Sequence, residues 1–482
     1  MKQTTGIIII MTLIGPAMLS AGETGKSGNN KETLTYESYL EQVQAKLPEI
    51  KTNLLQVKKS ENTLNRAKKV HDTTLTGSTQ YYRQKEYTTG ATIFDIDHTE
   101  GYNAYTGIER IIAPTGTRIS AGINYSQTSM KGTLSSQPQS VTYDTYQPSV
   151  TASITQPLLN NAFGILDRYA ENDALMKLEI QKLQREEDDR SVMNYYRKLY
   201  FDWLFFTRAA EIMAETINNA LSLESTVRRK ARAGLAENDD IQNAHSSVLQ
   251  YKTQLEQYRM QLNSIEKELG IYIEMEKYRS DRKQMEEMFQ RAVEYNYSTV
   301  SYDTTTTSQI LRKNIEKMKY SLGVKQNSSL PSLNLVGSVT RKNYDETFSG
   351  ATEQLDDTDY SIGFEFSYPL GNHNAEADIE EARLALEELE KQHQSSANSY
   401  LKRLNSLLES VEGYRQVIQT REENLNTLKS QLQTERKKYA QARLDLQYLI
   451  ATENSIASER LTILEQQLQI IGLYIDYRDL TK

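Results

Sequence analysis

Two patterns of apolar and polar positions divide the chain. The tracts 162–291 and 372–478 contain no Pro and are rich in Glu, Gln, Lys, Arg, Ala and Leu, which are residues that favour helix. Their apolar positions recur every three or four residues, as Leu425, Leu428 and Leu432 do. This spacing predicts long helices that pack as a bundle or as a coiled coil.

Between the helical tracts, apolar residues alternate with polar ones. The run "YSIGFEFSYPL" places one row of apolar side chains on one face of a strand: Tyr360, Ile362, Phe364, Phe366 and Tyr368. Val150, Ala152 and Ile154 form a similar row. Each run has about 10 residues, which is the length of a tilted strand that crosses a bilayer. A half-buried strand in a soluble sheet would show the same alternation.

The N-terminus resembles an export signal. Lys2 precedes the apolar run "GIIIIMTLIGPAML" and the small residues of "SAGE", which is the order found in a secretory signal peptide. We therefore predict a signal peptide over 1–22, with the mature chain starting near Gly22 or Glu23. An uncleaved anchor is the alternative, but the run is shorter than the roughly 20 residues that a bilayer span requires.

Composition excludes several classes of protein. The chain has no Cys, which rules out disulfides, thiol catalysis and an anchor built on an acylated cysteine. A quarter of the residues are charged, and no stretch beyond the signal is apolar enough for a spanning helix. The net charge is −8, and both signs are mixed along the helices, so the sequence has no basic patch that would indicate nucleic-acid binding.

Candidate chemistry is sparse. The five His residues are scattered without zinc spacing, and no glycine-rich loop could cradle a phosphate. Acidic residues cluster in "FDIDHTE" (94–100) and "LDDTDY" (355–360), where calcium binding is conceivable, although solvated loop acids explain both runs. We therefore predict no catalytic residue, no cofactor and no metal.

The strand regions of the two halves of the chain match each other. Gly77 in "TLTGSTQYY" corresponds to Gly337 in "NLVGSVTRKNY", at a spacing of 337 − 77 = 260. Pro157 in "ITQPLL" corresponds to Pro369 in "FSYPLG", at 369 − 157 = 212. The first half therefore carries 260 − 212 = 48 extra residues between its strands, which the segment 94–143 supplies. This segment contains its own candidate hairpin, which is either an extracellular extension, the favoured interpretation, or a pair of additional barrel strands.

The helical regions match as well. Gly234 in "RRKARAGLAENDDIQNA" corresponds to Ala442 in "RKKYAQARLDLQYLIAT", at 442 − 234 = 208. Each half is thus predicted to read helix, strand, strand, very long helix, turn, long helix. Because Ala replaces Gly in the second turn, the sequence does not require a left-handed residue there as it does in the first turn.

The predicted organisation follows from this duplication. Residues 23–230 form the first part of the first repeat, with barrel strands over about 75–158. Residues 231–300 form its helical tip and return helix. Residues 301–482 form the second repeat, with strands over about 331–369.

Strands of this kind in an exported protein require partners. An open sheet in lipid leaves backbone groups unsatisfied at its edges, so several copies of the chain must pool their strands into a closed barrel. The predicted helices of roughly 65 residues extend about 100 Å at 1.5 Å per residue, which is a reach suited to the periplasm.

Over nearly the whole mature chain, this sequence resembles the TolC-like outer-membrane factors. The resemblance rests on the duplicated plan, on "SITQPLLNNAFG" and "FSYPLG" as strand ends that lead into long helices, and on "AGLAENDDIQNA" repeated as "YAQARLDLQYLIAT". It implies an α+β membrane protein built from an internal duplication. Three copies would form one outer-membrane β-barrel of twelve strands, continued by a periplasmic α-helical coiled-coil barrel.

The resemblance also implies a function. Members of that family are exit ducts of tripartite efflux pumps or type I secretion systems, they work with a periplasmic adaptor and an inner-membrane transporter, and they catalyse nothing. The implied location is the outer membrane of a double-membrane bacterium, in contact with its lipid. A secreted coiled-coil or adhesin-like protein with a soluble head is the alternative, although it does not explain two strand sets that each precede a long helical hairpin.

Matching the family motifs assigns residues to the tip. Six positions at the two turns are implied to dock the adaptor: Gly234, Leu235, Ala236, Ala442, Arg443 and Leu444. Asp240 and Tyr439 occupy the positions of a carboxylate and a tyrosine that hold the entrance closed in relatives. The alternative is that Asp240 has only a structural role and favours the start of the next helix. Tyr448 and Ala451 occupy positions where relatives carry an acidic ring, which leaves Asp445 as a shifted candidate.

The alternation assigns the barrel faces. Five apolar residues are expected to face lipid: Val150, Ile154, Ile362, Phe364 and Phe366. The intervening polar residues, such as Ser361 and Glu365, are expected to face the lumen, because a charge in the hydrocarbon zone costs about 2 to 4 kcal/mol.

Overall fold

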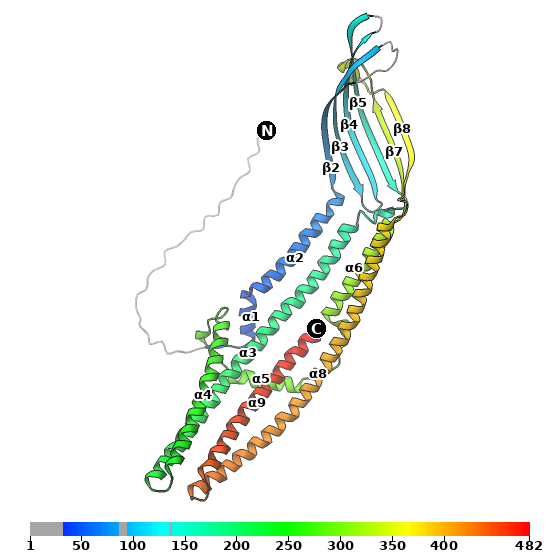
Figure 1. Cartoon of the computed structure of the whole chain (residues 1–482). Helices are drawn as coiled ribbons and strands as arrows, with labels where there is room; N and C mark the ends of the chain where they lie inside the picture. Colours follow the sequence, from blue (N-terminus) through cyan, green and yellow to red (C-terminus); the bar gives the residue numbers. More distant parts are fainter. Residues whose placement is uncertain (1–31, 86–93, 135–136) are drawn as a thin grey trace, which may run out of the picture.

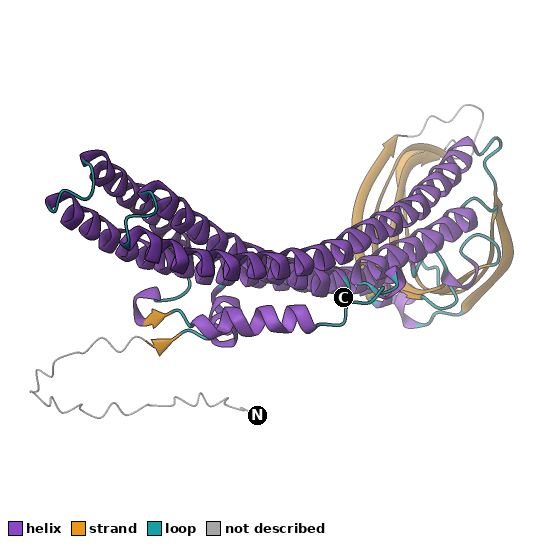
Figure 2. Cartoon of the chain, turned by 90° about the horizontal axis from the view of Figure 1, so that it is seen from below, coloured by secondary structure: helices purple, strands orange, loops and turns teal. Residues whose placement is uncertain are grey.

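A computed structural model describes residues 32–85, 94–134 and 137–482. Long helices form an elongated body, and a curved antiparallel sheet continues from one end of it (Figures 1 and 2). The predicted signal peptide, 1–22, lies outside the described residues. Among the helices of the described chain, none is both long enough and apolar enough to cross a membrane.

The long helices follow the duplicated plan. Helices α3 and α8, with 64 and 68 residues, confirm the predicted length. Each half contributes a helix that leads into the sheet, a very long helix that leaves it, and a shorter return helix (Figure 1): α2 (Pro48–Ala67), α3 (Tyr169–Arg232) and α4 (Asn238–Leu269), then α6 (Thr306–Ser328), α8 (His373–Ala440) and α9 (Leu446–Leu480).

The larger sheet has six strands within the described residues. They are β2 (Thr73–Lys85), β3 (Phe94–Ile112), β4 (Thr117–Leu134), β5 (Gln137–Pro157), β7 (Ser332–Lys342) and β8 (Asp357–Ser367). The strands follow the order β2-β3-β4-β5-β7-β8, and every neighbouring pair is antiparallel. A short helix, α7 (Phe348–Glu353), lies between β7 and β8.

This order corrects the favoured interpretation of the segment 94–143. The segment is not merely an appendage, because it supplies β3, β4 and the start of β5, and β3 and β4 lie between β2 and β5 in the sheet. Within the described residues, the first half therefore contributes four strands of the larger sheet and the second half two. Both strands of this hairpin alternate apolar and polar residues, so they can pair with the neighbouring strands and keep the two faces of the sheet distinct.

The helical composition of 162–291 overstated the length of the return helix. Helix α4 ends at Leu269, and the chain then makes a short strand, β6 (Tyr278–Arg279), which pairs in parallel with β1 (Glu32–Thr33). Two further helices, α1 (Tyr36–Lys46) and α5 (Arg282–Glu294), pack here. Gly270 and the Asp281 cap of α5 mark the interruption that composition alone concealed.

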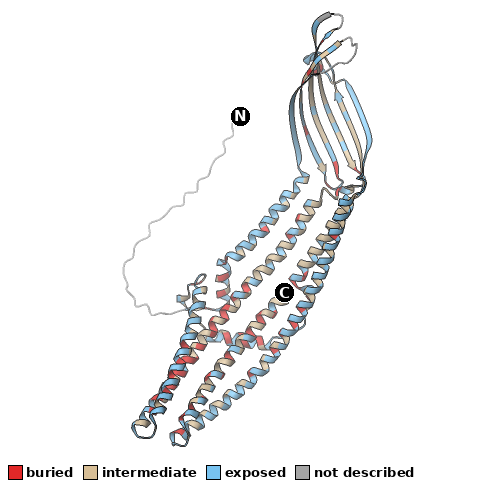
Figure 3. Cartoon of the chain, in the orientation of Figure 1, coloured by how far each residue is buried: buried red, intermediate tan, exposed pale blue. Residues whose placement is uncertain are grey.

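The main core lies around the middle of the long helices, where α1, α5 and α9 pack against α3 (Figure 3). Tyr39 and Tyr200 are fully buried, yet each hydroxyl has a partner: that of Tyr39 donates to the carbonyl of Tyr196, and that of Tyr200 to the carbonyl of Leu34, both at 2.8 Å. Trp203, 2% exposed, packs in the same cluster. These hydrogen bonds let aromatic side chains fill the core without leaving a polar atom unpaired.

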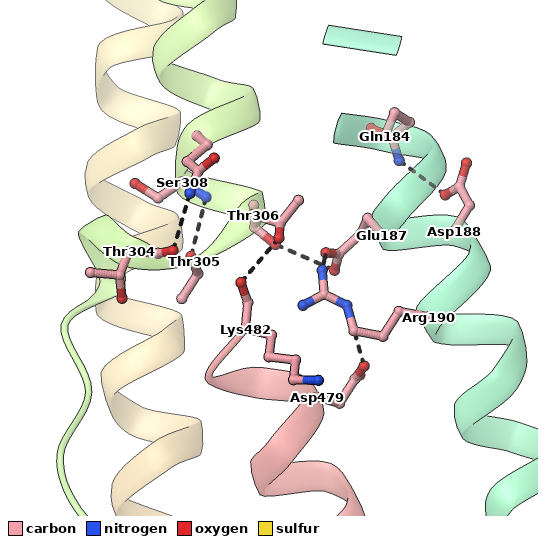
Figure 4. A network of polar contacts seen from close by, with 12 residues as sticks. Gln184, Glu187, Asp188, Arg190, Thr304, Thr305, Thr306, Ser308, Asp479 and Lys482 are labelled. Carbon is pink, nitrogen blue, oxygen red and sulfur yellow. Dashed lines mark hydrogen bonds and ion pairs between the residues drawn. The ribbon is translucent and has the colours of Figure 1, made fainter. Parts of the chain in front are cut away.

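Polar contacts join the last helix to the start of α6 (Figure 4). The amide and hydroxyl of Thr306 both donate to the main-chain oxygen of Lys482, each at 3.0 Å. Arg190 of α3 forms ion pairs with Glu187 and with Asp479, the latter at 3.7 Å. The start of α6 is thereby joined to the C-terminal end of the chain after α9, and Arg190 joins α9 to α3.

Candidate channel wall and helical tip

A band of apolar side chains crosses one face of the large sheet and includes residues of all six described strands. The register places Ile154 opposite Gly337, and Gly337 opposite Ile362, so the side chains on this face come from alternate residues of each strand. The exposed apolar residues of this face include Leu75, Ile108, Ile119, Ile123, Val150, Ile154, Val339, Ile362, Phe364 and Phe366. The five residues expected to face lipid therefore share one face.

The opposite face carries hydroxyl groups. Three pairs of hydroxyls contact each other across neighbouring strands: Ser120 and Ser153 at 2.6 Å, Thr151 and Thr340 at 3.0 Å, and Ser338 and Ser361 at 2.7 Å. Glu365 lies on this face, beside its neighbours Gly363 and Ser367. Such a surface suits water far better than hydrocarbon.

Aromatic residues mark the distal limit of the apolar face. The rings of Tyr81 and Tyr102 lie 4.9 Å apart, and Phe348 of α7 contacts both Tyr125 and Tyr146. Beyond this row the same face becomes charged, because Lys131 of β4 forms a 2.7 Å ion pair with Glu100 of β3. The distal ends of β3 and β4 thus extend past the apolar zone, whereas their remaining parts lie within it.

The turn between β3 and β4 is seated at the junction where β5 leads toward α3. A Cβ atom added to Gly164 would lie 1.8 Å from the carbonyl oxygen of Ala113, and one added to Gly116 would lie 2.9 Å from that of Asn161. Gly116 and Gly164 have positive φ angles, 74° and 63°. The inserted hairpin is therefore held closely at its helical end, and no side chain fits between the two segments at these points.

The two helical hairpins end in equivalent turns at the end of the body opposite the sheet (Figure 1). Gly234 and Ala442 have φ angles of 72° and 54°. The amide of Leu235 donates to the carbonyl of Lys230 at 2.8 Å, and the amide of Arg443 donates to that of Lys438 at 2.9 Å. Both turns are Schellman motifs, so the geometry of the second turn equals that of the first despite the alanine.

The six expected docking positions fall on these turns. Leu235 is 69% exposed, and Gly234, Ala442 and Arg443 are exposed as well. Ala236 and Leu444 are partly buried against a small core beneath the turns, formed by Val227, Ala244, Tyr439, Leu446 and Leu449. The tip therefore presents a narrow surface of backbone and short loops on a packed base.

Asp240 and Asp445 both stabilise the starts of helices at the tip. Asp240 accepts a hydrogen bond from the amide of Glu237 at 3.1 Å in a capping box, and Asp445 accepts one from the amide of Gln447 at 3.3 Å. The structural role weighed for Asp240, support for the start of a helix, is thus present. Asp445 is equivalent to Glu237, since 445 − 208 = 237, and both residues are N-caps.

Tyr439 is buried beside these caps. Its hydroxyl has no hydrogen-bond partner among the described residues, and Lys230 places its ammonium 3.7 Å from the centre of the ring. Burial, with smaller contributions from Asp240 and Asp445, raises the pKa of Tyr439 above its usual value of 10.0. The hydroxyl is therefore neutral at physiological pH, and it does not bond to Asp240 in this conformation.

A resident metal site was not found in the described ranges: no group of three or more His, Asp or Glu side chains there could hold an ion. The acidic runs 94–100 and 355–360 instead lie mostly in strands. Asp97 contacts His98 at 2.8 Å, and Asp359 contacts Lys342 at 2.6 Å.

No family model matches the sequence, and no curated protein matches it either. Solved structures do match over almost the whole chain. The outer membrane protein VceC of Vibrio cholerae has a TM-score of 0.62 and 11% identity, over 92% of this chain and 96% of that one. The Campylobacter jejuni CmeC outer membrane channel has a TM-score of 0.60 and 11% identity, over 97% and 93%. The open Neisseria gonorrhoeae MtrE outer membrane channel has a TM-score of 0.60 and 12% identity, over 95% and 93%.

The chain has the fold of an outer-membrane channel. The TolC-like resemblance is thereby confirmed for the fold of the single chain, whose large sheet has one apolar face and one hydroxyl-lined face. The favoured sequence interpretation left β3 and β4 outside the sheet, whereas the alternative, a pair of additional strands, agrees with the strand order. The signal was present, since Ile119, Ala121 and Ile123 alternate with polar residues as regularly as the residues of β8 do.

Proposed function

We propose that this protein is the outer-membrane exit duct of a tripartite efflux pump or of a type I secretion system. Three copies would pool their sheets into a barrel in the outer membrane, and their long helices would continue it as a tunnel through the periplasm. Substrates would enter at the helical tip from an inner-membrane transporter, to which a periplasmic adaptor would join the duct at the two turns.

One observation carries the proposal: a two-faced sheet with open edges is joined to helices of 64 and 68 residues. The apolar face needs an apolar environment, and the hydroxyl-lined face needs water. At 1.5 Å per residue the helices reach about 100 Å, which a soluble head on a stalk would not require.

Fractionation tests this function. Protein expressed from the full gene should be recovered in the outer membrane, require detergent for extraction, and run as an oligomer that dissociates only on heating. A deletion strain should accumulate exported dyes or secreted cargo, and the intact gene should restore export. Release by salt, or recovery from the medium, would instead support the secreted coiled-coil protein.

A closed state of the tip is the second part of the proposal. An open duct would leak, so the helix ends need a contact that holds them together, and Asp240 and Tyr439 are the candidate pair. Their placement supports this assignment, because Ile241, next to Asp240, packs against the small core that contains Tyr439, and the unpaired tyrosine hydroxyl is available as a donor.

A further inference from the structure

The two edge strands of the described sheet leave a seam that another copy must close. Strands β2 and β8 are at opposite edges of the sheet (Figure 1), with β2 running away from the helices and β8 running toward them. Two such strands from neighbouring copies would meet antiparallel. This inference rests on the proposed duct, in which an open edge in lipid would leave a row of backbone groups without hydrogen bonds.

The duplication fixes which residues are equivalent, and the sheet preserves that equivalence. In the second half, Gly337 lies directly opposite Ile362. In the first half, the row of paired residues that starts at Gly77 crosses β3 and β4 and reaches Val150. The offsets are 337 − 77 = 260 and 362 − 150 = 212, the same values that the sequence comparison gives. The hairpin has therefore been inserted without shifting the rows of the sheet.

Within one copy, the last strand of the first half pairs with the first strand of the second half, with Ile154 of β5 opposite Gly337 of β7. The equivalent pairing between copies joins the last strand of the second half, β8, to the first strand of the first half, β2. Adding 212 to 154 gives 366, and subtracting 260 from 337 gives 77. We propose that neighbouring copies join through β8 and β2 with Phe366 opposite Gly77, so that paired residue numbers add to 443.

The side chains at this seam fit one another. Gly337 accommodates Ile154, whose Cγ2 lies 3.5 Å from the position of an added Cβ. At Gly77, the corresponding position meets only the carbonyl oxygen of Tyr105, at 3.8 Å, among the described atoms. The open surface above Gly77 can thus receive the ring of Phe366, as aromatic side chains commonly cover glycines in neighbouring strands.

The register also keeps the two faces of the wall continuous. On the apolar face, Phe364 lies opposite Thr79 and Ile362 opposite Tyr81, because 364 + 79 and 362 + 81 both equal 443. A slip of one residue would turn every side chain of one strand to the wrong face, so only slips by an even number of residues compete.

Barrel geometry discriminates between those slips. The row of directly paired residues that starts at Gly77 crosses the sheet and ends at Thr358 of β8. In the proposed register, Thr358 pairs with Lys85 of the next copy. Crossing six strands therefore shifts the row along β2 by 85 − 77 = 8 residues. With about 3.3 Å per residue and about 4.8 Å between strands, the strands tilt by about 42°. Slips of two residues give about 35° or about 49°, which lie at or beyond the ends of the usual range of roughly 35–45°.

The consequence is a wider pore than the resemblance implies. Three copies with six strands each would form eighteen strands rather than twelve. Because barrel diameter grows roughly in proportion to strand number, the barrel would be about one and a half times as wide. The proposed duct would then be much less restrictive at the membrane than a twelve-stranded barrel.

Cysteine cross-linking tests the seam, since the natural chain contains no Cys. One variant carries Thr76→Cys with Ser367→Cys on the polar face, and a second carries Thr79→Cys with Phe364→Cys on the apolar face. A cysteine pair is placed on each face because alternate residue pairs in an antiparallel ladder differ in the distance between their Cα atoms. The slipped controls combine Ser367→Cys with Thr74→Cys or with Ser78→Cys, and Ser338→Cys with Ser361→Cys reports cross-linking within a copy.

Oxidised full-length protein from outer membranes is then run under denaturing, non-reducing conditions. At least one matched pair should give at least fivefold more covalent oligomer than either slipped control, in a ladder that ends at three copies. Equal or greater yield from a slipped control would overturn the register while the heat-sensitive oligomer, and with it the proposed function, stands. Loss of any oligomer from the wild-type protein would overturn both.

Discussion

Gly234 and Ala442 adopt the same left-handed backbone conformation at the two ends of the duplicated helical hairpins, with φ angles of 72° and 54°. The same pair of Schellman hydrogen bonds surrounds each residue. The turn is therefore imposed by the hairpin, and the second half maintains it with a residue that disfavours it. An L-residue with a side chain costs roughly 1–2 kcal/mol in this conformation, which glycine avoids.

Ala442→Gly should consequently stabilise the second turn by about 1 kcal/mol. Hydrogen exchange at the amide of Arg443, which bonds to Lys438, should slow by about fivefold for this gain. Gly234→Ala is the matched control: no atom within 4 Å would contact its added Cβ, so backbone strain alone should speed exchange at the first turn. Unchanged exchange in both variants would contradict the strain argument.

Gly164→Ala should disrupt the seat of the inserted hairpin. The added Cβ would overlap the carbonyl oxygen of Ala113, and the positive φ of Gly164 adds strain. We expect a marked loss of heat-resistant oligomer in outer membranes. Gly363→Ala, where the added Cβ meets open space, should assemble at the wild-type level. Normal assembly of Gly164→Ala would show that the hairpin need not be seated there.

The face assignment predicts opposite outcomes at neighbouring positions. Phe364→Arg places a charge on the apolar face, where it costs about 2 to 4 kcal/mol at the centre of a bilayer, and should impair assembly. Glu365→Arg changes a residue of the hydroxyl-lined face and should spare assembly. The amount of heat-modifiable oligomer in outer membranes measures both, and equal assembly of the two variants would rule out the assigned faces.

The repeating parts of the fold were predictable from sequence because each rests on a local period. Leucine spacing indicated α3 and α8, and alternation indicated β5 and β8, since these patterns follow directly from helix and strand geometry. The equivalence of Gly77 with Gly337 then gave the duplicated plan. The position of the two tip turns also followed, because charged helical residues precede Gly234 in a recognisable motif.

What failed depends on contacts between distant segments. The place of β3 in the sheet is decided by pairing with β2 and β4 and by the seat of its turn against Gly164, which no local pattern reveals. Helix α4 stops at Leu269 although the composition continues to favour helix, because the following residues join the core with α1 and α5. The capping role of Asp445 was equally hidden, since it depends on where α9 begins.

The docking assignment predicts that bulk at the tip blocks the adaptor. Gly234→Trp should abolish export and prevent capture of the adaptor by the purified oligomer, while the amount of oligomer stays normal, because this turn lies far from the sheet (Figure 1). Gly234→Ala carries the same backbone strain without the bulk and should retain export. Normal export by Gly234→Trp would place the docking surface elsewhere.

The gate assignment makes the most demanding prediction. The hydroxyl of Tyr439 is buried and unpaired in the described conformation, so Tyr439→Phe should not weaken this conformation and should relieve part of a desolvation cost of about 1–3 kcal/mol. A closed state held by a bond from Tyr439 to the carboxylate of Asp240 would lose about 1.5–3 kcal/mol for each copy. We therefore expect Tyr439→Phe to raise single-channel conductance in planar bilayers and to sensitise cells to large antibiotics such as vancomycin.

Separating gating from capping requires a variant that acts on one role only. Asp240→Ala removes both the capping box with Glu237 and the proposed bond, so its effect alone decides nothing. Tyr439→Phe leaves the cap intact, and the double variant should conduct little more than Tyr439→Phe, because both changes break the same bond. If Tyr439→Phe conducts as the wild type does with an unchanged amount of oligomer, Asp240 is a helix cap and the gate lies elsewhere. Because the raised pKa keeps Tyr439 protonated, the wild-type conductance should not change between about pH 6 and pH 9 through this group.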